Sequence, residues 1–141
     1  MARAVTGRRD MADDIAQDAF ERAFAALPRF DRRRPFAPWL HRIVVNRSLD
    51  LLRIERRLVG AEGDFEAPEW SDPTSGDAGL LDAVACLSAP RRVVIVLRYG
   101  LGYPPGEIAA MLDLPVGTVH SRLARALDDL RNERERDVER A

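Results

Sequence analysis

The sequence has one cysteine, two histidines and no lysine among its 141 residues. A single Cys86 excludes an internal disulfide, and Cys86 with His41 and His120 offers no plausible zinc site. We therefore expect no metal and no cofactor, and we expect Cys86 to be a small buried residue. No stretch approaches the roughly 18 consecutive apolar residues of a membrane span, and residues 1–11 lack the apolar core of a secretory signal. These absences indicate a cytoplasmic protein without a membrane partner.

The charge is arranged in blocks along the chain. Apolar residues make up 46% and charged residues 32%, which is typical of a folded globular protein. The overall net charge of −1 conceals four blocks of alternating sign: −4 for residues 10–28, +6 for 29–58, −7 for 59–90 and +3 for 91–127. Because all 22 basic residues are arginine, arginine abundance by itself does not indicate phosphate binding. The positions of the arginines are the useful signal.

An acidic segment divides the chain. Residues 59–79 combine glycine, proline, serine and acidic residues without a helical or strand period, which is typical of a linker. On both sides the apolar spacing is close to 3.6 residues. The sequence therefore predicts an all-α protein with two small helical domains, residues 1–58 and 80–141, joined by a flexible acidic linker at 59–79.

The first predicted helix, residues 11–27, has an apolar side and an acidic side. The apolar side is formed by Ala12, Ile15, Ala16, Ala19, Ala23, Ala26 and Leu27. The opposite side carries Asp14, Gln17, Asp18 and Glu21. Spacing alone leaves two interpretations open for this side, a solvated acidic surface or a docking surface for a basic partner.

The next predicted helix, residues 37–57, follows an arginine-rich loop between Pro28 and Pro35, which end one helix and delay the next. One side of it groups Leu40, His41, Val44, Val45, Ser48, Leu51 and Leu52. The other side groups Trp39, Arg42, Ile43, Asn46, Asp50, Arg53 and Arg57. Either Trp39 and Ile43 pack beneath the preceding helix, or this side binds nucleic acid, with arginine on phosphates, the aromatic ring on unpaired bases and the amide on a base edge.

The second block has the pattern of a helix-turn-helix. Helices are expected at about 80–87, from Pro90 to a stop at Gly100 and Gly102, at 105–112, and from Pro115 onward. From residue 107 to residue 123, apolar residues bracket a short turn at Asp113, and the small Ala109 permits a close helix crossing. Asp113 suits a tight turn, because Asp enters left-handed backbone more readily than most residues.

The last predicted helix places two kinds of side chain on opposite sides. Its buried side is expected to hold Val116, Val119, Leu123, Ala126, Leu127 and Leu130. Its far side contains Gly117, Thr118, Ser121, Ala124, Arg125 and Asp128, with His120 and Arg122 at the edges. Small residues permit close approach to a DNA groove, and hydroxyl groups and arginine reach phosphates or base edges. For His120, a plain solvent-exposed imidazole is at least as good an interpretation.

These motifs resemble regions 2 and 4 of the extracytoplasmic-function (ECF, group 4) sigma factors of RNA polymerase, which belong to the sigma-70 family. The resemblance is carried by DDIAQDAFERAFAALPRFDRRRPFAPWLHRIVVNRSLDLLR and PRRVVIVLRYGLGYPPGEIAAMLDLPVGTVHSRLARALDDLR. It implies a transcription initiation factor that binds core RNA polymerase and recognises the minus-10 and minus-35 promoter elements. Promoter DNA and an anti-sigma factor are implied as further partners, and no catalytic residue is implied.

The resemblance also assigns roles to residues of this sequence. It implies polymerase binding by Asp14, Gln17, Asp18 and Glu21. It implies that the loop from Phe30 to Phe36 cradles a flipped minus-10 base, and that Phe36, Trp39, Asn46, Asp50 and Arg53 bind the opened element. It implies minus-35 contacts by Thr118, His120, Ser121, Arg122 and Arg125.

The sequence departs from the family pattern at its start. Family members usually have further helices before the acidic one, and here only residues 2–10 resemble their end, so region 2 is expected to be short and the apolar side of residues 11–27 to lose part of its cover. The rival interpretation of the whole chain is a stand-alone helix-turn-helix regulator of duplex DNA. The side of the second helix that carries Trp39 and Asn46 argues against it, because such a regulator has no need to bind opened strands.

Overall fold

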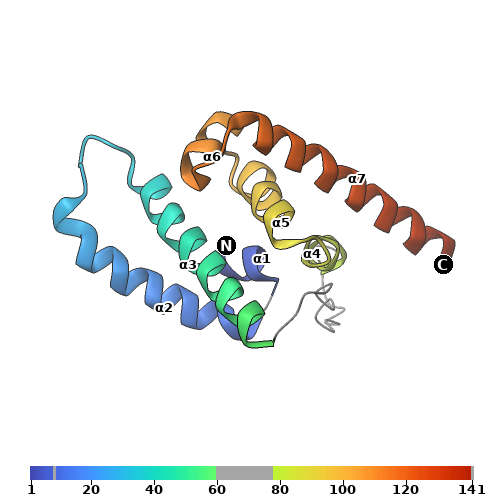
Figure 1. Cartoon of the computed structure of the whole chain (residues 1–141), viewed down its shortest axis with the longest axis horizontal. Coiled ribbons are helices and arrows are strands. Elements are labelled where there is room, and N and C mark those ends of the chain that lie inside the picture. The colour runs from blue at the N-terminus through green and yellow to red at the C-terminus, as the bar shows by residue number, and fades with distance from the viewer. Residues whose placement is uncertain (8, 60–77, 141) are drawn as a thin grey trace. The chain divides into compact units, whose positions relative to one another are not determined.

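The computed structural model describes residues 1–7, 9–59 and 78–140 (Figure 1), and every regular element in these residues is a helix. The chain forms two compact units, one with α1 to α3 and one with α4 to α7. This confirms the predicted fold class. The predicted linker falls almost entirely on residues 60–77, which lie outside the described residues, and its two ends belong to helices α3 and α4.

The first unit consists of α1 (Ala2–Thr6), α2 (Arg9–Ala26), the 3₁₀ turn η1 (Leu27–Arg29) and α3 (Phe36–Val59). The two long helices pack along each other through the small and β-branched residues that the periodicity placed inward. The buried residues of these two helices are Ile15, Ala19, Ala23, Val45, Ser48 and Leu52. Pro28 and Pro35 lie at the predicted boundaries, since α2 ends just before the first and α3 begins just after the second.

Two expectations for the first helix need correction. Leu27 is 46% exposed rather than buried, because α2 ends at Ala26 and the chain turns away from the core in η1. The apolar side of α2 is also better covered than the sequence suggested. The short helix α1 packs against both α2 and α3 and buries Ala2 and Val5. Left-handed backbone at Gly7, with φ of 68°, ends α1.

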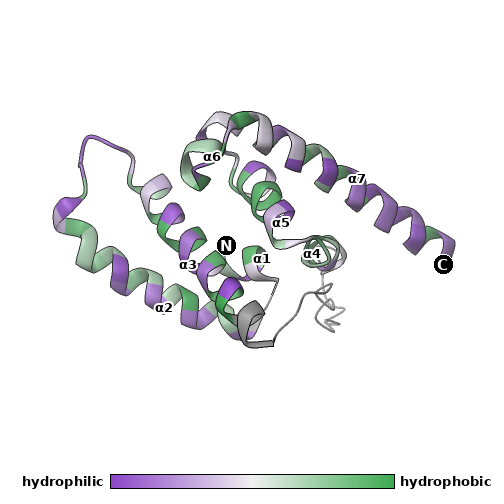
Figure 2. Cartoon of the chain, in the orientation of Figure 1, coloured by the Kyte–Doolittle hydropathy of each residue, from purple (hydrophilic) through white to green (hydrophobic). Residues whose placement is uncertain are grey.

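The second unit consists of α4 (Ala78–Ala85), α5 (Ala89–Ile95), the π-helical turn η2 (Val96–Gly100), α6 (Pro105–Leu112) and α7 (Val116–Arg140). Its core is made of residues from all four α-helices. The fully buried members with the largest side chains are Val93, Val94, Leu97, Ile108 and Val119. Figure 2 shows that the C-terminal half of α7 is almost uniformly hydrophilic, so α7 contributes to the core only through its first half.

Two residues of the second unit lie elsewhere than predicted. Val116 is 48% exposed, because it is the first residue of α7 and lies in the turn that follows α6. Cys86 is exposed, because α4 ends at Ala85 and leaves Cys86 in the connection to α5. It faces a groove that α7 lines with Asp129, Asn132, Glu133 and Arg136. Partial burial, with Glu133 and Asp82 nearby, raises the pKa of the Cys86 thiol.

Candidate nucleic-acid interface

The turn between α6 and α7 holds the two helices as a helix-turn-helix. Asp113 has φ of 55° and ψ of 51°, so the left-handed residue expected at this turn is confirmed. The amide of Leu114 donates to the carbonyl of Ala109 at 3.0 Å, which closes α6. The Pro115 carbonyl then accepts from the amides of Thr118 and Val119 at 3.0 and 3.3 Å. Because these bonds fix where α7 begins, they fix which of its residues point away from the core.

The outward side of α7 follows the prediction for Ser121, Arg122 and Arg125, whereas Thr118 and His120 exchange their expected places at its centre and its edge. His120, Ser121 and Arg125 are exposed, and Thr118 and Arg122 are half-buried at its margins. Val119, Leu123 and Ala126 are buried on the opposite side. We call Thr118, His120, Ser121, Arg122 and Arg125 the α7 face.

The arginines of α7 fall into two classes. Further along the helix, Arg131 pairs with Asp128 and Arg136 with Glu133, both at 3.6 Å. Within the part of the chain that the structure describes, Arg122 and Arg125 form no ion pair. The α7 face therefore presents positive charge that is not neutralised within the protein, which is what a phosphate-binding surface requires.

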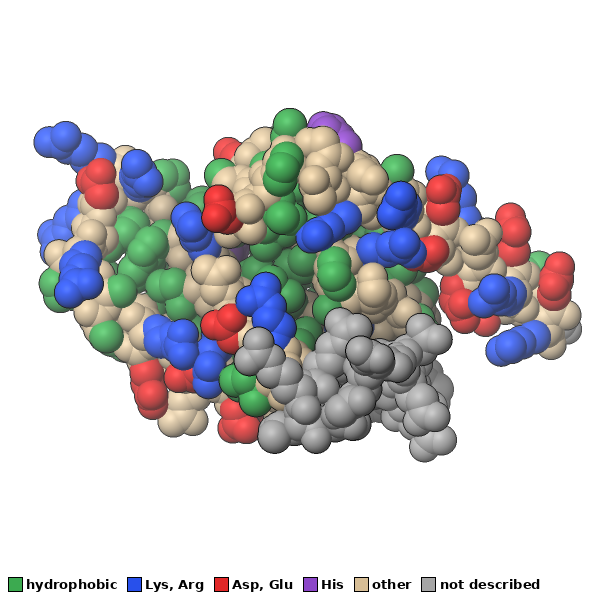
Figure 3. Space-filling model, in the orientation of Figure 1, with side chains coloured by type: hydrophobic (Ala, Val, Ile, Leu, Met, Phe, Trp, Pro, Cys, Tyr) green, Lys and Arg blue, Asp and Glu red, His purple; other side chains and the backbone are tan. Residues whose placement is uncertain are grey.

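The loop between η1 and α3 presents three arginines on a preorganised backbone. The Asp31 carboxylate accepts from the amide of Arg33 at 3.0 Å, and the Asp31 carbonyl accepts from the amide of Arg34 at 3.0 Å. These bonds form an Asx turn inside a β-turn. The side chains of Arg32, Arg33 and Arg34 are exposed, and Figure 3 shows basic side chains gathered at this end of the first unit.

An aromatic cluster closes the base of this loop. The rings of Phe30 and Phe36 meet edge to face with centroids 5.7 Å apart, and Trp39 lies 4.8 Å from Phe30 and 5.4 Å from Phe36. Such pairs stabilise a fixed arrangement beyond the area that they bury. The cluster accounts for Trp39 being half-buried, so the ring packs on the loop, while Phe36 stays 48% exposed.

The outward side of α3 continues from this cluster. Asn46 and Arg53 are exposed, and Arg53 lies 3.5 Å from Asp50 in an ion pair within the helix. Val45, Ser48 and Leu52 are buried on the inward side, as the periodicity predicted. The first unit therefore brings the predicted minus-10 residues together on the loop and one side of α3.

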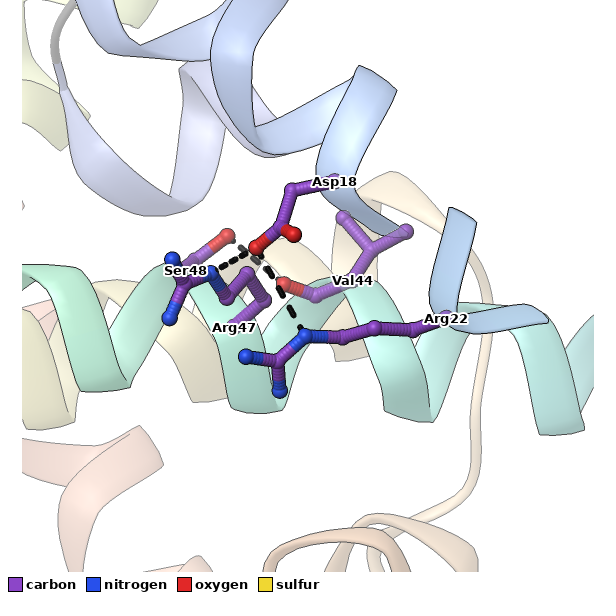
Figure 4. A network of polar contacts seen from close by, with 5 residues as sticks. All are labelled: Asp18, Arg22, Val44, Arg47 and Ser48. Atoms are coloured by element: carbon purple, nitrogen blue, oxygen red, sulfur yellow. Dashed lines mark hydrogen bonds and ion pairs between the residues drawn. The ribbon is translucent and has the colours of Figure 1, made fainter. Parts of the chain in front are cut away.

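The acidic side of α2 does not behave as one surface. Asp14, Gln17 and Glu21 are exposed. Asp18 instead forms an ion pair with Arg47 of α3, and its Oδ2 lies 3.5 Å from Nε of Arg22 (Figure 4). Three of the four predicted docking residues thus face solvent, and the fourth is engaged with a neighbouring helix.

Sequence reasoning missed two residues on this side of α2. Phe20 is 56% exposed and Phe24 is 74% exposed. With Gln17 and Glu21 they follow the spacing i, i+3, i+4 and i+7, which places all four on one side of a helix. That spacing is visible in the sequence, and large apolar residues at polar-side positions were the available signal.

The described residues contain neither a metal-binding cluster nor a membrane span. Among them no three His, Cys, Asp or Glu side chains gather as a metal site would require. Of the helices placed in the structure, none is long and apolar enough to cross a membrane.

Comparison with known proteins gives the same two regions. The family model of sigma-70 region 2 matches residues 1–58, and that of sigma-70 region 4 matches residues 78–130. The ECF RNA polymerase sigma factor SigW of Bacillus subtilis is 32% identical over 142 residues, covering 86% of this chain and 74% of that protein. The chain belongs to the ECF sigma factors.

Two further sigma factors extend the comparison. CnrH of Cupriavidus metallidurans is 38% identical over 130 residues, covering 81% of this chain and 68% of CnrH. Its structure in complex with the cytosolic domain of CnrY covers 96% of this chain and 80% of that one with a TM-score of 0.68. The structure of the sigma factor RpoE in complex with the anti-sigma factor NepR from Bartonella quintana has a TM-score of 0.74 at 25% identity, covering 93% of this chain and 85% of that one.

Family membership fixes the function at the level of the whole chain. This ECF sigma factor binds RNA polymerase and promoter DNA and initiates transcription at promoters. Sigma factors are not enzymes, so no catalytic role is assigned to any residue. The family also decides against the rival interpretation, a regulator that acts without polymerase.

Proposed function

We propose that three separate surfaces of this sigma factor make the three contacts that initiation requires. The exposed side of α2 docks on core polymerase, the loop with the outward side of α3 holds the opened minus-10 strand, and the α7 face reads the minus-35 duplex. In this proposal residues 1–58 act as the region 2 domain and residues 80–141 as the region 4 domain. The work takes place in the cytoplasm.

The minus-35 assignment depends on the unpaired arginines of the α7 face. Arg125 is exposed, and its neighbours on that side, Ser121 and Ala124, are too small to shield it. A guanidinium that lacks a carboxylate partner in the protein is available for a phosphate or for a guanine edge in the major groove. Arg131 and Arg136 have acidic neighbours at 3.6 Å on the same helix, and no DNA contact is assigned to them.

The minus-10 assignment depends on the aromatic cluster and the turn above it. Phe30, Phe36 and Trp39 fix the loop ends, and the Asp31 turn fixes the tip, so a displaced base meets a formed surface and little ordering is needed on binding. The exposed Phe36 ring offers a stacking platform, and Asn46 offers both a donor and an acceptor for a base edge.

The docking assignment combines charge with apolar area. Asp14, Gln17 and Glu21 supply polar contacts, and the exposed rings of Phe20 and Phe24 supply the area that typically dominates binding energy. We include both phenylalanines in the proposed polymerase-binding surface. An anti-sigma factor, as found with RpoE, would inhibit this chain most simply by covering the same surface.

Run-off transcription with core polymerase tests whether the three surfaces have the proposed roles. The template is a promoter that the holoenzyme selects from a randomised library. Arg125→Ala should weaken minus-35 duplex binding by about 1 to 3 kcal/mol, while Arg131→Ala, its matched control on the same helix, should not. Glu21→Arg should abolish co-purification with core polymerase. Unchanged minus-35 affinity and sequence preference in the Arg125 variant would contradict the assignment of α7.

A further inference from the structure

We propose that Asp18 is a positioning residue that holds α3 against α2 and is not itself a polymerase contact. The inference rests on the proposed function for the two helices, since it concerns how the docking helix supports the helix that holds the opened strand. It removes Asp18 from the docking surface and gives it a partner within the chain, Arg47.

The contact joins two different helices. Figure 4 shows the Asp18 carboxylate of α2 directed at the Arg47 side chain of α3. The side chain of Asp18 is 31% exposed and that of Arg47 is 22% exposed. The two atoms that meet, Oδ2 of Asp18 and Nε of Arg47, are both buried. Removing either partner would therefore leave the other with a poorly solvated charge, which is the costly way to break an ion pair.

A second arginine on the same oxygen provides an internal comparison. Arg22 lies one turn after Asp18 on α2, at 3.5 Å, and its side chain is 49% exposed. Pairs of this kind within an exposed helix contribute little, and salt screens them. The Arg22 contact stays within α2, whereas only the Arg47 contact can affect how α3 is placed.

The position of Arg47 explains what the ion pair would control. Its neighbours are Asn46, which is exposed, and Ser48, which is fully buried with its hydroxyl donating to the Val44 carbonyl at 2.8 Å. Successive residues of a helix differ by about 100° in direction. Holding Arg47 toward α2 and Ser48 toward the core therefore fixes the direction of Asn46. The same constraint acts one turn later on Asp50.

This arrangement predicts two separable properties for α2. The residues that should affect polymerase affinity are the exposed ones, such as Glu21. Asp18 should affect the stability of the first unit and the opening of the minus-10 element, and it should do so only through Arg47.

The test compares variants of the full chain by three measurements. The variants are Asp18→Ala, Arg47→Ala, the exchanged pair D18R/R47E, and two controls, Arg22→Ala and Glu21→Arg. The measurements are thermal unfolding of the free chain by circular dichroism, affinity for core polymerase, and fluorescence of 2-aminopurine placed in the minus-10 element. The first measurement needs neither polymerase nor DNA.

Asp18→Ala and Arg47→Ala should each lower the Tm of the free chain by roughly 4 to 8 °C. The two variants should also slow promoter opening, and by the same factor as each other. Both should keep core affinity within about two-fold, and D18R/R47E should recover most of the Tm and of the opening rate. Arg22→Ala should match the parent chain in all three measurements.

The proposal is overturned if Asp18→Ala lowers core affinity as strongly as Glu21→Arg while Arg47→Ala does not. It is equally overturned if the exchanged pair recovers neither stability nor opening. If Glu21→Arg binds core polymerase normally, the docking assignment of α2 is wrong, and the Tm values of the free chain still decide whether Asp18 acts through Arg47.

Discussion

Arg92 is a buried charged residue that hydrogen-bonds the end of the preceding helix, α4. It is only 5% exposed, and its Nη2 donates to the carbonyls of Leu87 and Ala85 at 2.7 and 3.1 Å. The Ala85 carbonyl lies at the C-terminal end of α4, where a helix leaves acceptors without partners and carries partial negative charge, and the Leu87 carbonyl lies in the turn that follows. Burial lowers the pKa of Arg92, but arginine remains protonated at neutral pH.

Replacing Arg92 should therefore destabilise the second unit. Arg92→Met keeps the apolar stem and removes the donors, so the two carbonyls lose charge-assisted bonds, and we expect a loss of about 2 to 3 kcal/mol in the free energy of unfolding. Arg92→Lys should lose less, because one ammonium keeps the charge but not the planar fork. Chemical denaturation measures both variants, and a parental midpoint for Arg92→Met would contradict this account.

Single residues were predictable where the backbone was the constraint. Left-handed backbone could be expected at Asp113 because a short turn falls there and Asp accepts that conformation more readily than most residue types. Asp18, Cys86 and Arg92 could not be placed, because their environments depend on contacts between helices. Asp18 and Arg47 are 29 positions apart, and periodicity gives only the side of a helix, not the partner that meets it.

At the scale of the element, the helix boundaries followed local chemistry. Proline and the αL residues marked the ends of α2, α3 and α6 to within about two residues. The short helix α1 was missed because five residues are too few for a periodic pattern. Of the candidate site, the α7 face followed from periodicity, whereas the aromatic cluster required knowing how the loop closes.

Replacing Gly117 of α7 by alanine should affect the Tm and the affinity for the minus-35 duplex in different ways. A Cβ added there meets no atom of the chain within 4 Å, and alanine is favoured over glycine in helices by up to about 1 kcal/mol. Gly117→Ala should therefore leave the Tm unchanged or raise it. On the DNA side the added methyl group should weaken minus-35 binding by about 1 kcal/mol or more, since it crowds a close contact.

The matched control is Gly79→Ala on α4, where an added Cβ is equally unhindered and no DNA contact is proposed. Fluorescence anisotropy with a minus-35 duplex measures both variants. If Gly117→Ala binds as tightly as the parent chain, the start of α7 does not approach the groove closely.

The loop at Asp31 gives a second prediction at this scale. Asp31→Ala removes the acceptor for the Arg33 amide, and the loop should lose order before it meets DNA. We expect holoenzyme binding to a forked minus-10 template to weaken about five-fold, which corresponds to about 1 kcal/mol for one hydrogen bond. Asp31→Asn keeps a side-chain acceptor and should bind normally. Equal loss in both variants would indicate that the carboxylate charge matters and the turn does not.

For the whole molecule, the division into two units makes each unit testable on its own. The second unit has a complete core, since Val94, Leu97, Ile108 and Val119 are buried by residues of α4 to α7. A fragment of residues 78–140 should therefore fold as a helical domain with a cooperative thermal transition. Circular dichroism measures this directly, and a fragment without such a transition would show that the second unit depends on the first.

The same fragment should bind a minus-35 duplex with a salt dependence set by few contacts. If Arg122 and Arg125 each neutralise one phosphate, the slope of log K against log salt should be about −2. A titration at several salt concentrations gives the slope. A slope near zero would exclude phosphate contact by both arginines.

Cys86 makes the chain convenient for labelling. It is the single cysteine of the sequence and it is exposed, so a maleimide dye would attach once per molecule without any substitution. The groove that it faces adjoins the half of α7 beyond the proposed DNA-facing positions. Because partial burial and nearby carboxylates raise the pKa of the thiol, coupling should be slow at neutral pH and faster under mildly alkaline conditions. A dye at this position would let single-molecule fluorescence follow the second unit while the polymerase opens a promoter.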